Sequence, residues 1–469
     1  MKQETLATMN GLSQEFPGAA AARSLLNSVL ERYGTRDFAV ELWDGERWPA
    51  QTPEPERFKL LLRSPSAVRA LFSRADSLSF GEAFVYNQVD IQGSLLNIFA
   101  PADRLMTISW SFADKCRLLA KLWSIPMPSY ARSGLFAGFG AAGHQDSPAR
   151  TRAAVNYHYD HPVEFWRLWL DESLVYSCAY FQSADDSLGA AQQAKLDYIC
   201  RKLRLRPGMR LLDMGCGWGA LVVHAASHYG VEAVGLTVSQ EQAEVARERI
   251  RQAGLEGRCR VEVNDFFDWF EPEGFDRVTS VGAAEHVPEK RFEEYFKLAC
   301  TSLRPGGQFL HHAISRTPSA PERPGRGFNH RYVFPDHFLA SIGETLSAAE
   351  TAGFEIRDVE SLREHYALTL KHWLQRFEAA EDALMRLTDE ISCRVFRLYL
   401  AGTAYEFQCG RVNLHQSLLV KPKGGQSGLP LTRDDWYGSD ASLAGVLSHP
   451  HYEKDAVTGV TQFGHGRSD

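Results

Sequence analysis

The sequence predicts an α/β fold in which helices cover both faces of a mostly parallel sheet. Between residues 150 and 422, short apolar runs alternate with helical patterns, which is typical of βαβ units. One of these runs, LLDM at residues 211–214, continues directly into a glycine-rich turn, as at the ligand-binding end of a doubly wound sheet. The 469 residues suggest two or three domains, so we expect a second, smaller unit before the sheet.

The first 125 residues predict a small α+β unit. Residues 38–43 form a strand-like run, and residues 58–62 and 68–73 are amphipathic. Residues 81–93 are an apolar segment with a glycine at each end, which indicates a pair of strands with a turn.

Basic and apolar side chains are mixed around the end of this unit. We assign residues 1–130 to the domain and residues 131–150, rich in Pro, Gly and Ala, to a linker. The mixture suits contact with lipid headgroups, and a surface helix followed by a flexible joint explains it equally well. The residues concerned are Lys115, Arg117, Leu118, Leu119, Lys121, Trp123, Arg132, Phe136 and Phe139.

The α/β domain occupies residues 151–422. The expected strands are residues 211–214, 231–236, 261–263, 276–281, 308–314 and 413–420. The expected helices are residues 220–229, 240–254 and 289–303, and a helical insertion at residues 366–407 precedes the last strand. Residues 423–469 are polar and glycine-rich, so we expect a poorly ordered tail there.

The glycine-rich turn has the spacing D-x-G-x-G-x-G, formed by Asp213, Gly215, Gly217 and Gly219. Glycine lets the backbone pass close to a ligand, and the N–H groups of the following helix point toward that ligand. The spacing differs from the G-x-G-x-x-G of dinucleotide enzymes, and no Walker-type lysine follows it. An acid ahead of the glycines suits a ligand with a positive centre, such as the amino group of S-adenosylmethionine. The alternative is an ordinary strand–helix corner.

Composition excludes several classes of function. A formal net charge of −7 gives no global basic field for nucleic acid or an anionic bilayer, so any lipid contact is local. The eight cysteines show no CxxC pair and no disulfide framework. No apolar run approaches the ~18 residues of a membrane span, and the polar N-terminus lacks a signal-peptide core. We therefore expect a cytoplasmic protein.

Eight motifs along the α/β domain occur in an order typical of one family. They are YSCAYF (176–181), AQQAKLDYI (191–199), LDMGCGWG (212–219), VGLTVSQEQ (234–242), VGAAEHV (281–287), LHHAIS (310–315), RYVFP (331–335) and HYALTLKHWLQRF (365–377). On these motifs the chain resembles the cyclopropane-fatty-acyl-phospholipid synthase and mycolic-acid methyltransferase family. The resemblance implies a Rossmann-like S-adenosylmethionine methyltransferase domain with a mostly parallel, seven-stranded sheet and a helical substrate-binding insertion. Residues 81–99 resemble the family's phospholipid-binding domain loosely.

The resemblance also implies a set of cofactor-binding residues, which are Tyr176, Ser177, Asp213, Gly215, Gly217, Thr237, Gln242, Asp265 and Phe266. Thr237 and Gln242 follow the second strand, where the ribose of a nucleoside would lie and where dinucleotide enzymes place an acid. Asp265 is suited to accept the exocyclic amine of adenine, with the following phenylalanine stacked on the ring. A helix N-cap and a core phenylalanine are the alternatives. Tyr176 and Ser177 would fold over the carboxylate end of the cofactor.

A reaction centre is implied in the same way. The resemblance makes Cys178, Glu285, His312 and Tyr366 catalytic and has them hold a bicarbonate ion together with Ile314. Glu285 follows the fourth strand and His312 lies on the fifth, at the end of the sheet where ligands bind. Cys178 is a candidate nucleophile, but a small buried apolar residue is the commoner role of a free cysteine.

Two features stay outside this scheme. The family usually has YDLGNDF where residues 159–165 of this chain are YDHPVEF, which puts the substrate shape or the product in doubt. The pairs His158/His161 and His311/His312 lack a third and a fourth ligand, so we expect no metal.

The implied reaction transfers a methylene group from S-adenosylmethionine to the cis double bond of unsaturated phospholipid acyl chains and forms cyclopropane fatty acids. A carbocation on the acyl chain, shielded from water, would lose a proton to the bicarbonate. The alternatives are a fatty-acyl C-methyltransferase that makes methyl- or methylene-branched chains, a small-amine N-methyltransferase, and a lipid-binding protein with a decayed enzyme domain. The family further suggests a homodimer in peripheral contact with the inner face of the membrane. We expect no nucleic-acid partner.

Overall fold

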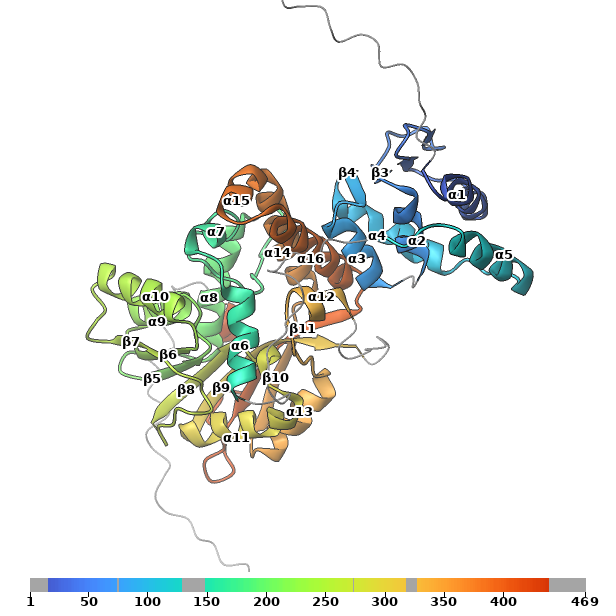
Figure 1. The fold of residues 1–469 in the computed structure, drawn as a ribbon. Coiled ribbons are helices and arrows are strands. Elements are labelled where there is room, and N and C mark those ends of the chain that lie inside the picture. Colours follow the sequence, from blue (N-terminus) through green and yellow to red (C-terminus); the bar gives the residue numbers. More distant parts are fainter. Residues whose placement is uncertain (1–15, 74–75, 129–147, 273, 318–326, 438–469) are drawn as a thin grey trace, which may run out of the picture.

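The computed structural model describes residues 16–73, 76–128, 148–272, 274–317 and 327–437, and these residues form two sheets. A seven-stranded sheet forms the larger body, and a four-stranded sheet with its helices lies beside the helical insertion (Figure 1). Most of the expected linker at residues 131–150 and the last part of the expected tail, residues 438–469, lie outside the described residues. The end of the expected linker, residues 148–150, is wrong, because it forms the start of α6 (Pro148–Tyr159).

The large sheet has the strand order β10–β11–β9–β8–β5–β6–β7. Its parallel run comprises β5 (Arg210–Met214), β6 (Glu232–Thr237), β7 (Cys259–Val263), β8 (Phe275–Val281) and β9 (Leu303–Arg316). Beyond it, β11 (Val412–Val420) pairs antiparallel with both β9 and the edge strand β10 (Glu355–Ser361). The predicted mostly parallel, seven-stranded α/β sheet is therefore confirmed.

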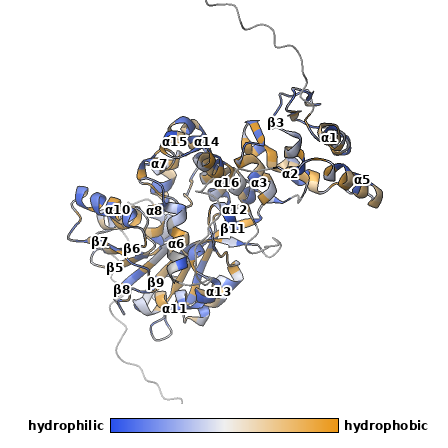
Figure 2. Ribbon diagram, in the orientation of Figure 1, coloured by the Kyte–Doolittle hydropathy of each residue, from blue (hydrophilic) through white to orange (hydrophobic). Residues whose placement is uncertain are grey.

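Helices bury both faces of this sheet. Leu211 and Ala233 belong to a hydrophobic cluster with α8 (Leu188–Lys202), α9 (Ala220–Tyr229) and α10 (Gln240–Gln252). Their chain neighbours Leu212 and Val234 point to the other face, where the cluster includes α11 (Phe292–Ser302) and α13 (Ile342–Thr351). Figure 2 shows hydrophobic residues along the central strands and hydrophilic ones on the outer helices. This two-sided burial explains why the strands are apolar runs rather than alternating ones.

The predicted helical insertion consists of α14 (Arg363–Ala379), α15 (Glu381–Leu387) and α16 (Glu390–Gln408). It lies between β10 and β11, and α14 and α16 pack against each other. Three short helices complete this side of the domain: α6 (Pro148–Tyr159), α7 (Val163–Arg167) and α12 (Phe328–Tyr332). Among the described residues, no helix combines the length and the apolarity that crossing a membrane requires.

The small sheet has the order β2–β1–β3–β4. Its strands are β1 (Ala39–Glu41), β2 (Arg47–Trp48), β3 (Phe58–Leu62) and β4 (Val89–Gly93). The helices of this unit are α1 (Ala19–Tyr33), α2 (Pro65–Ser73), α3 (Ser77–Val85), η1 (Leu95–Ile98), α4 (Phe99–Met106) and α5 (Phe112–Trp123).

The prediction of two strands at residues 81–93 is wrong, because this segment is the end of α3 followed by β4. Gly81 lies inside the helix rather than at a turn. A Cβ atom at Gly81 would overlap the ring of Phe328, so the glycine allows α3 to approach α12 closely. Gly81, which suggested a turn in the sequence, therefore lies at a contact between the two units.

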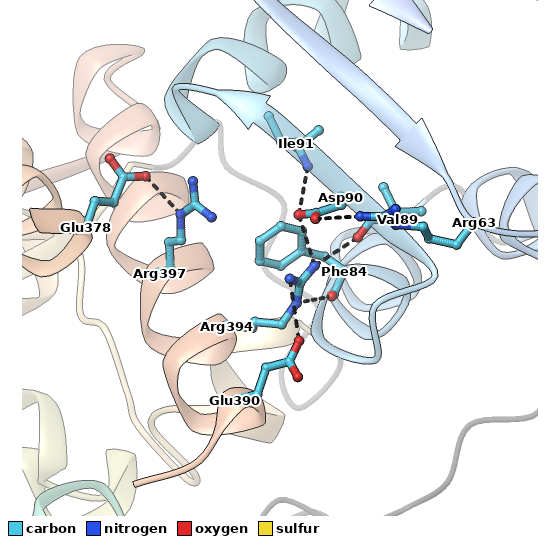
Figure 3. Close-up of polar contacts among 9 residues, drawn as sticks. All are labelled: Arg63, Phe84, Val89, Asp90, Ile91, Glu378, Glu390, Arg394 and Arg397. Carbon is cyan, nitrogen blue, oxygen red and sulfur yellow. Dashed lines mark hydrogen bonds and ion pairs between the residues drawn. The ribbon is translucent and has the colours of Figure 1, made fainter. Parts of the chain in front are cut away.

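One buried arginine connects the two units (Figure 3). Arg394 of α16 donates from Nε to the Phe84 carbonyl oxygen at 2.7 Å and from Nη2 to the Val89 carbonyl oxygen at 3.0 Å. Its guanidinium lies 4.3 Å from the centre of the Phe84 ring and 3.3 Å from a carboxylate oxygen of Asp90. On the other side of α16, Arg397 donates to Glu378 of α14 at 2.9 Å. The insertion thus packs against the small unit through polar contacts as well as apolar ones.

The prediction of a poorly ordered tail does not hold for residues 423–437. α17 (Asp434–Tyr437) returns to α8, where Trp436 is buried and Asp435 pairs with Arg204 at 2.7 Å. The buried indole of Trp436 anchors this segment on α8, although the composition of the segment is polar and glycine-rich.

Candidate active site

A cleft opens at the carboxyl ends of β5, β6 and β8, where parallel sheets bind their ligands. All nine residues predicted to bind a cofactor line it: Tyr176, Ser177, Asp213, Gly215, Gly217, Thr237, Gln242, Asp265 and Phe266. Lys195 of α8 also lines this cleft, although the sequence analysis did not single it out. The structure therefore gathers these residues, from four of the eight motifs together with Asp265 and Phe266, on one surface.

The glycine turn is held against the sheet and leaves one position open. The N–H groups of Gly215 and Cys216 donate to the carbonyl oxygen of Leu236 at 3.1 and 2.8 Å. Gly215 has a φ of +93°, and a Cβ there would lie 2.5 Å from the Cβ of Ala283. Gly217 has a φ of +53°, but a Cβ there would meet no atom within 4 Å. Gly215 is thus required for packing, whereas the space beside Gly217 is free for a ligand.

The wall that follows β6 carries linked polar groups. The Thr237 hydroxyl donates to Oε1 of Gln242 at 2.7 Å, and Ser239 caps α10 through its side chain. Glu241 accepts from the N–H of Val163 at 2.8 Å. Val163 belongs to the departure from the family pattern, so that departure lies directly beside the expected ribose site.

Asp265 and Phe266 follow β7. Oδ1 of Asp265 accepts from the N–H of Phe267 at 3.0 Å, which stabilises a turn. No helix begins at this residue, so the N-cap alternative is wrong. The Phe266 ring packs on Phe267 and Tyr295 with centroid distances of 4.8 and 5.8 Å, yet it still contributes to the cleft surface.

Two buried charged groups of opposite sign line the same cleft. Asp213 accepts from the Thr279 hydroxyl at 2.8 Å, and burial raises the pKa of this carboxyl to about 6. The Lys195 ammonium donates to Oγ of Ser177 at 2.9 Å, and burial lowers its pKa to about 8. Each group influences the pKa of the other by its charge.

Next to the cleft, a glutamate leaves one oxygen without a partner. Oε1 of Glu285 accepts from the N–H of Ile314 at 2.8 Å, whereas Oε2 is buried and makes no hydrogen bond within the described part of the chain. Burial raises the pKa of Glu285 to about 7. A buried acceptor of this kind is costly to leave unsatisfied, which marks a place for a ligand that donates a hydrogen bond.

His312 presents a second unpartnered atom. Nε2 of Gln416 donates to Nδ1 of His312 at 3.2 Å, which leaves the ring proton on Nε2. That nitrogen is buried and has no partner among the described residues. Burial lowers the pKa of His312 well below its usual value, so the neutral ring offers an N–H donor.

The other predicted residues of this centre lie close by. The Sγ of Cys178 is fully buried and approaches the carbonyl oxygen of Leu362 at 3.9 Å, just before α14. Burial raises the pKa of this thiol far above its usual range, which argues against a nucleophilic thiolate. Burial raises the pKa of the Tyr366 hydroxyl well above its usual value, so this group is a neutral hydrogen-bond donor. Glu285 is hydrogen-bonded to Ile314, two residues beyond His312 on β9, and none of these residues belongs to the lining of the cleft.

Aromatic side chains pack around Tyr176 beside the cleft. Tyr176 OH lies 3.1 Å from Nε2 of His158 and 3.1 Å from the hydroxyl of Tyr399 on α16. The ring of Trp166 packs on those of Tyr176 and Trp218, with centroid distances of 5.1 and 5.4 Å. Sequence reasoning predicted Tyr176 but gave Trp166, Trp218 and Tyr399 no role, because an aromatic residue in an apolar pattern does not differ from a core residue.

The histidine pairs have protein partners. His158 uses Nδ1 on the Val333 carbonyl oxygen at 3.1 Å as well as Nε2 on Tyr176, and His311 contacts Tyr295 OH at 3.0 Å. In the ranges that the structure describes, no group of three His, Cys, Asp or Glu side chains has an arrangement suited to a metal ion.

Sequence comparison identifies the family. Residues 146–417, more than half of the chain, match the family model described as mycolic acid cyclopropane synthetase. This chain belongs to that family. Residues 25–107 match a second model, described as a domain of unknown function.

Several proteins are similar to this family member. A probable fatty acid methyltransferase of Pseudomonas putida is 36% identical over 403 residues, which cover 85% of this chain and 95% of the relative. The cyclopropane-fatty-acyl-phospholipid synthase of Escherichia coli is 38% identical over 277 residues, covering 59% and 69%. The crystal structure of a mycolic acid cyclopropane synthase complexed with SAH and CTAB is 35% identical, with a TM-score of 0.55 over 58% of this chain and 98% of that chain. The predicted family and fold are confirmed, and the protein is a methyltransferase of the cyclopropane synthase type that depends on S-adenosylmethionine.

The cleft of this family member fits S-adenosylmethionine. The open space beside Gly217 allows close approach to the backbone, and buried Asp213 suits the amino group. Thr237 and Gln242 offer polar atoms where a ribose would lie, and Phe266 offers a ring for adenine.

Proposed function

We propose that the protein transfers a methylene group from S-adenosylmethionine to the cis double bond of unsaturated phospholipid acyl chains, forming cyclopropane fatty acids. The observation that carries this proposal is the presence of two buried atoms without a partner among the described residues, Oε2 of Glu285 and Nε2 of His312, in a part of the domain rich in packed aromatic rings. A buried acceptor bonded to Ile314 and a buried donor two residues earlier on β9 suit a bicarbonate ion, which has a hydroxyl to donate and oxygens to accept. S-adenosylmethionine supplies an activated methyl group when bound.

The aromatic residues and the anion-holding residues would have different roles in this reaction. Trp166, Tyr176 and Tyr399 exclude water from a carbocation on the acyl chain and offer ring faces that stabilise positive charge. Glu285 and His312, with Ile314 and the backbone at Cys178, would orient bicarbonate, which would supply the base for the proton that the added carbon loses. Tyr366 would donate a hydrogen bond to the same ion.

The names of the relatives support an acyl substrate. One relative is named a probable fatty acid methyltransferase and another a cyclopropane-fatty-acyl-phospholipid synthase. We transfer the fatty acyl substrate to this chain on that basis. The phospholipid carrier and the ring product remain parts of the proposal that experiment must test.

We further propose that α5 contacts the membrane. Phe112, Leu119 and Trp123 lie on one side of this helix and are exposed by 84%, 52% and 76%. Exposed Lys115 lies next to this side of the helix, and anionic headgroups complement its charge, whereas Arg117 is paired with Asp114. An apolar helix face with basic neighbours suits a lipid interface better than free solvent. A homodimer is part of the same proposal, and light scattering tests it.

Vesicle binding tests the α5 proposal. Replacing both Phe112 and Trp123 with Ser should lower binding to vesicles of anionic phospholipid by at least about 10-fold, since burying one such side chain stabilises by ~1.5–3 kcal/mol. Leu431→Ser is the matched control, because Leu431 is exposed by 101% and lies far along the chain. Equal binding by the double variant and the control would refute a role for α5.

The lipids of cells that express the chain test the reaction itself. Mass spectrometry should detect acyl chains heavier by one CH2 that lack the original double bond. The same mass with retained unsaturation would assign the protein as a methyl- or methylene-branching enzyme instead. Unchanged lipids, together with turnover of an added amine, would favour the N-methyltransferase. Unchanged lipids and no turnover would indicate a lipid-binding protein. Cells that express Glu285→Gln are the control.

A further inference from the structure

Lys195 is a buried cation that forms no ion pair with any residue that the structure describes. Its side chain comes from α8 and is only 2% exposed. Within the described residues, its ammonium makes one hydrogen bond, to Oγ of Ser177 at 2.9 Å, and no ion pair. Removing an ammonium from water costs several kcal/mol unless an anion compensates it. A buried ammonium with donors to spare on the wall of a ligand cleft therefore indicates an anionic group on the ligand.

The nearby carboxylates do not provide that partner. Asp171 accepts from the N–H groups of Ser173 and Val175 at 2.9 and 2.8 Å, so backbone donors compensate it. Asp213 accepts from Thr279 and lines the cleft as Lys195 does. The cleft thus presents one buried positive and one buried negative group beside the open space at Gly217.

This pair of charges complements a zwitterion. We propose that Lys195 binds the α-carboxylate at the amino-acid end of S-adenosylmethionine, with Ser177 orienting the ammonium and Asp213 facing the α-amino group. The inference rests on the proposed use of this cofactor and adds a residue that makes the site specific for an intact amino acid. Bicarbonate is the other carboxylate-like anion considered, since beside the larger effect of burial the charge of Lys195 acts to lower the pKa of both Cys178 and His312. Lys195 lines the cleft, however, whereas Glu285 and His312 do not, so the geometry favours the ligand of the cleft.

Two ligands that differ by one group test the proposal. S-adenosylhomocysteine carries the carboxylate, and 5′-adenosyl-3-thiopropylamine is the same molecule without it. By calorimetry, the wild type should bind the first about 10–100-fold more tightly, the range expected for buried hydrogen bonds to a charged group. In Lys195→Met this preference should fall to within a few-fold of unity, because S-adenosylhomocysteine loses affinity and the amine does not. An unchanged preference in Lys195→Met would overturn the proposal.

Control variants separate recognition from folding. Lys202→Met removes the other deeply buried lysine, which is paired with Glu360 at 2.5 Å away from the cleft, and should keep the wild-type preference. Ser177→Ala should lower the preference part of the way, because the ammonium loses its orienting partner. This second variant keeps the test valid if Lys195→Met folds poorly, and a full wild-type preference in Ser177→Ala would contradict the orienting role.

The outcomes also separate this proposal from the proposed reaction. Intact discrimination between the two ligands with unaltered cell lipids would overturn the lipid reaction and leave Lys195 in its role. An altered response of the rate to bicarbonate in Lys195→Met, with ligand discrimination kept, would assign the ammonium to the other anion and overturn the proposal.

Discussion

Replacing Glu285 with Gln should make the protein more stable at alkaline pH while removing most of its activity. Burial raises the pKa of this carboxyl from 4.5 to about 7, so the folded protein holds the proton more tightly than the unfolded chain does. The contribution to stability is therefore fully present below pH 4.5 and is lost as the pH rises through about 7. A shift of about 2.5 pKa units corresponds to about 3 kcal/mol in total.

Glutamine cannot titrate, so the comparison between wild type and variant isolates this effect. Between pH 5 and pH 8, the unfolding free energy of Glu285→Gln relative to wild type should rise by about 2–3 kcal/mol. Urea denaturation at the two pH values measures this difference. Glu289→Gln removes an exposed carboxylate four residues later and serves as the matched control.

Although Glu285→Gln gains stability at high pH, its rate of lipid alkylation should fall. Losing one oriented catalytic contact typically lowers the rate by ~10²–10³-fold, and added bicarbonate should stimulate the wild type but not the variant. A stability difference that does not depend on pH would refute the argument from the buried charge. A fully active Glu285→Gln would refute the catalytic role.

Three further predictions concern other parts of the structure. Gly217→Ala should lower the free energy of unfolding by about 1–2 kcal/mol, because the backbone of Gly217 is left-handed. In calorimetry the same variant should bind S-adenosylhomocysteine at least about 10-fold more weakly. Gly215→Ala should lower the free energy of unfolding in urea by about 2–4 kcal/mol, because its Cβ would overlap Ala283. Equal effects of the two variants on stability and on affinity would contradict a packing role for Gly215 and a ligand role for Gly217. Arg394→Met should lower the unfolding free energy by about 2–4 kcal/mol, since two buried carbonyl oxygens and a carboxylate lose a charged donor, and a loss below 0.5 kcal/mol would show that the contact is dispensable. A thiol reagent should label only Cys116 and Cys409 rapidly in the native protein and all eight cysteines after unfolding; rapid labelling of a third thiol would contradict the described burial.

Local signals determined how much of the fold could be predicted. The helix expected at residues 220–229 is α9 with the same bounds, because glycines mark both of its ends. The edge strand β10 was missed, since its sequence EIRDVES lacks an apolar pattern and Asp358 is its one buried residue. Gly81 was assigned to a turn because its reason, the ring of Phe328, lies far away in the sequence.

In the candidate site too, local sequence signals could be predicted, whereas contacts between distant residues could not. Motif spacing alone predicted a ligand turn at residues 213–219, and the family resemblance supplied the partners that the structure now gathers on one cleft. Lys195 was passed over because a lysine within a helical pattern is usually solvated, and its partner Ser177 precedes it by 18 residues. The burial that makes such a group informative is a property of tertiary packing.

The contact between Arg394 and the small unit has a consequence for the order of events during synthesis. Asp90 precedes Arg394 by 304 residues. At about 5–20 residues per second, the ribosome needs about 15–60 s to make the chain between them. Throughout that interval Arg394 has not been made. The carbonyl oxygens of Phe84 in α3 and Val89 in β4 therefore lack their donor in the nascent small unit. The small unit can therefore satisfy these groups only after α16 has been made, so assembly of the two units is completed late in synthesis.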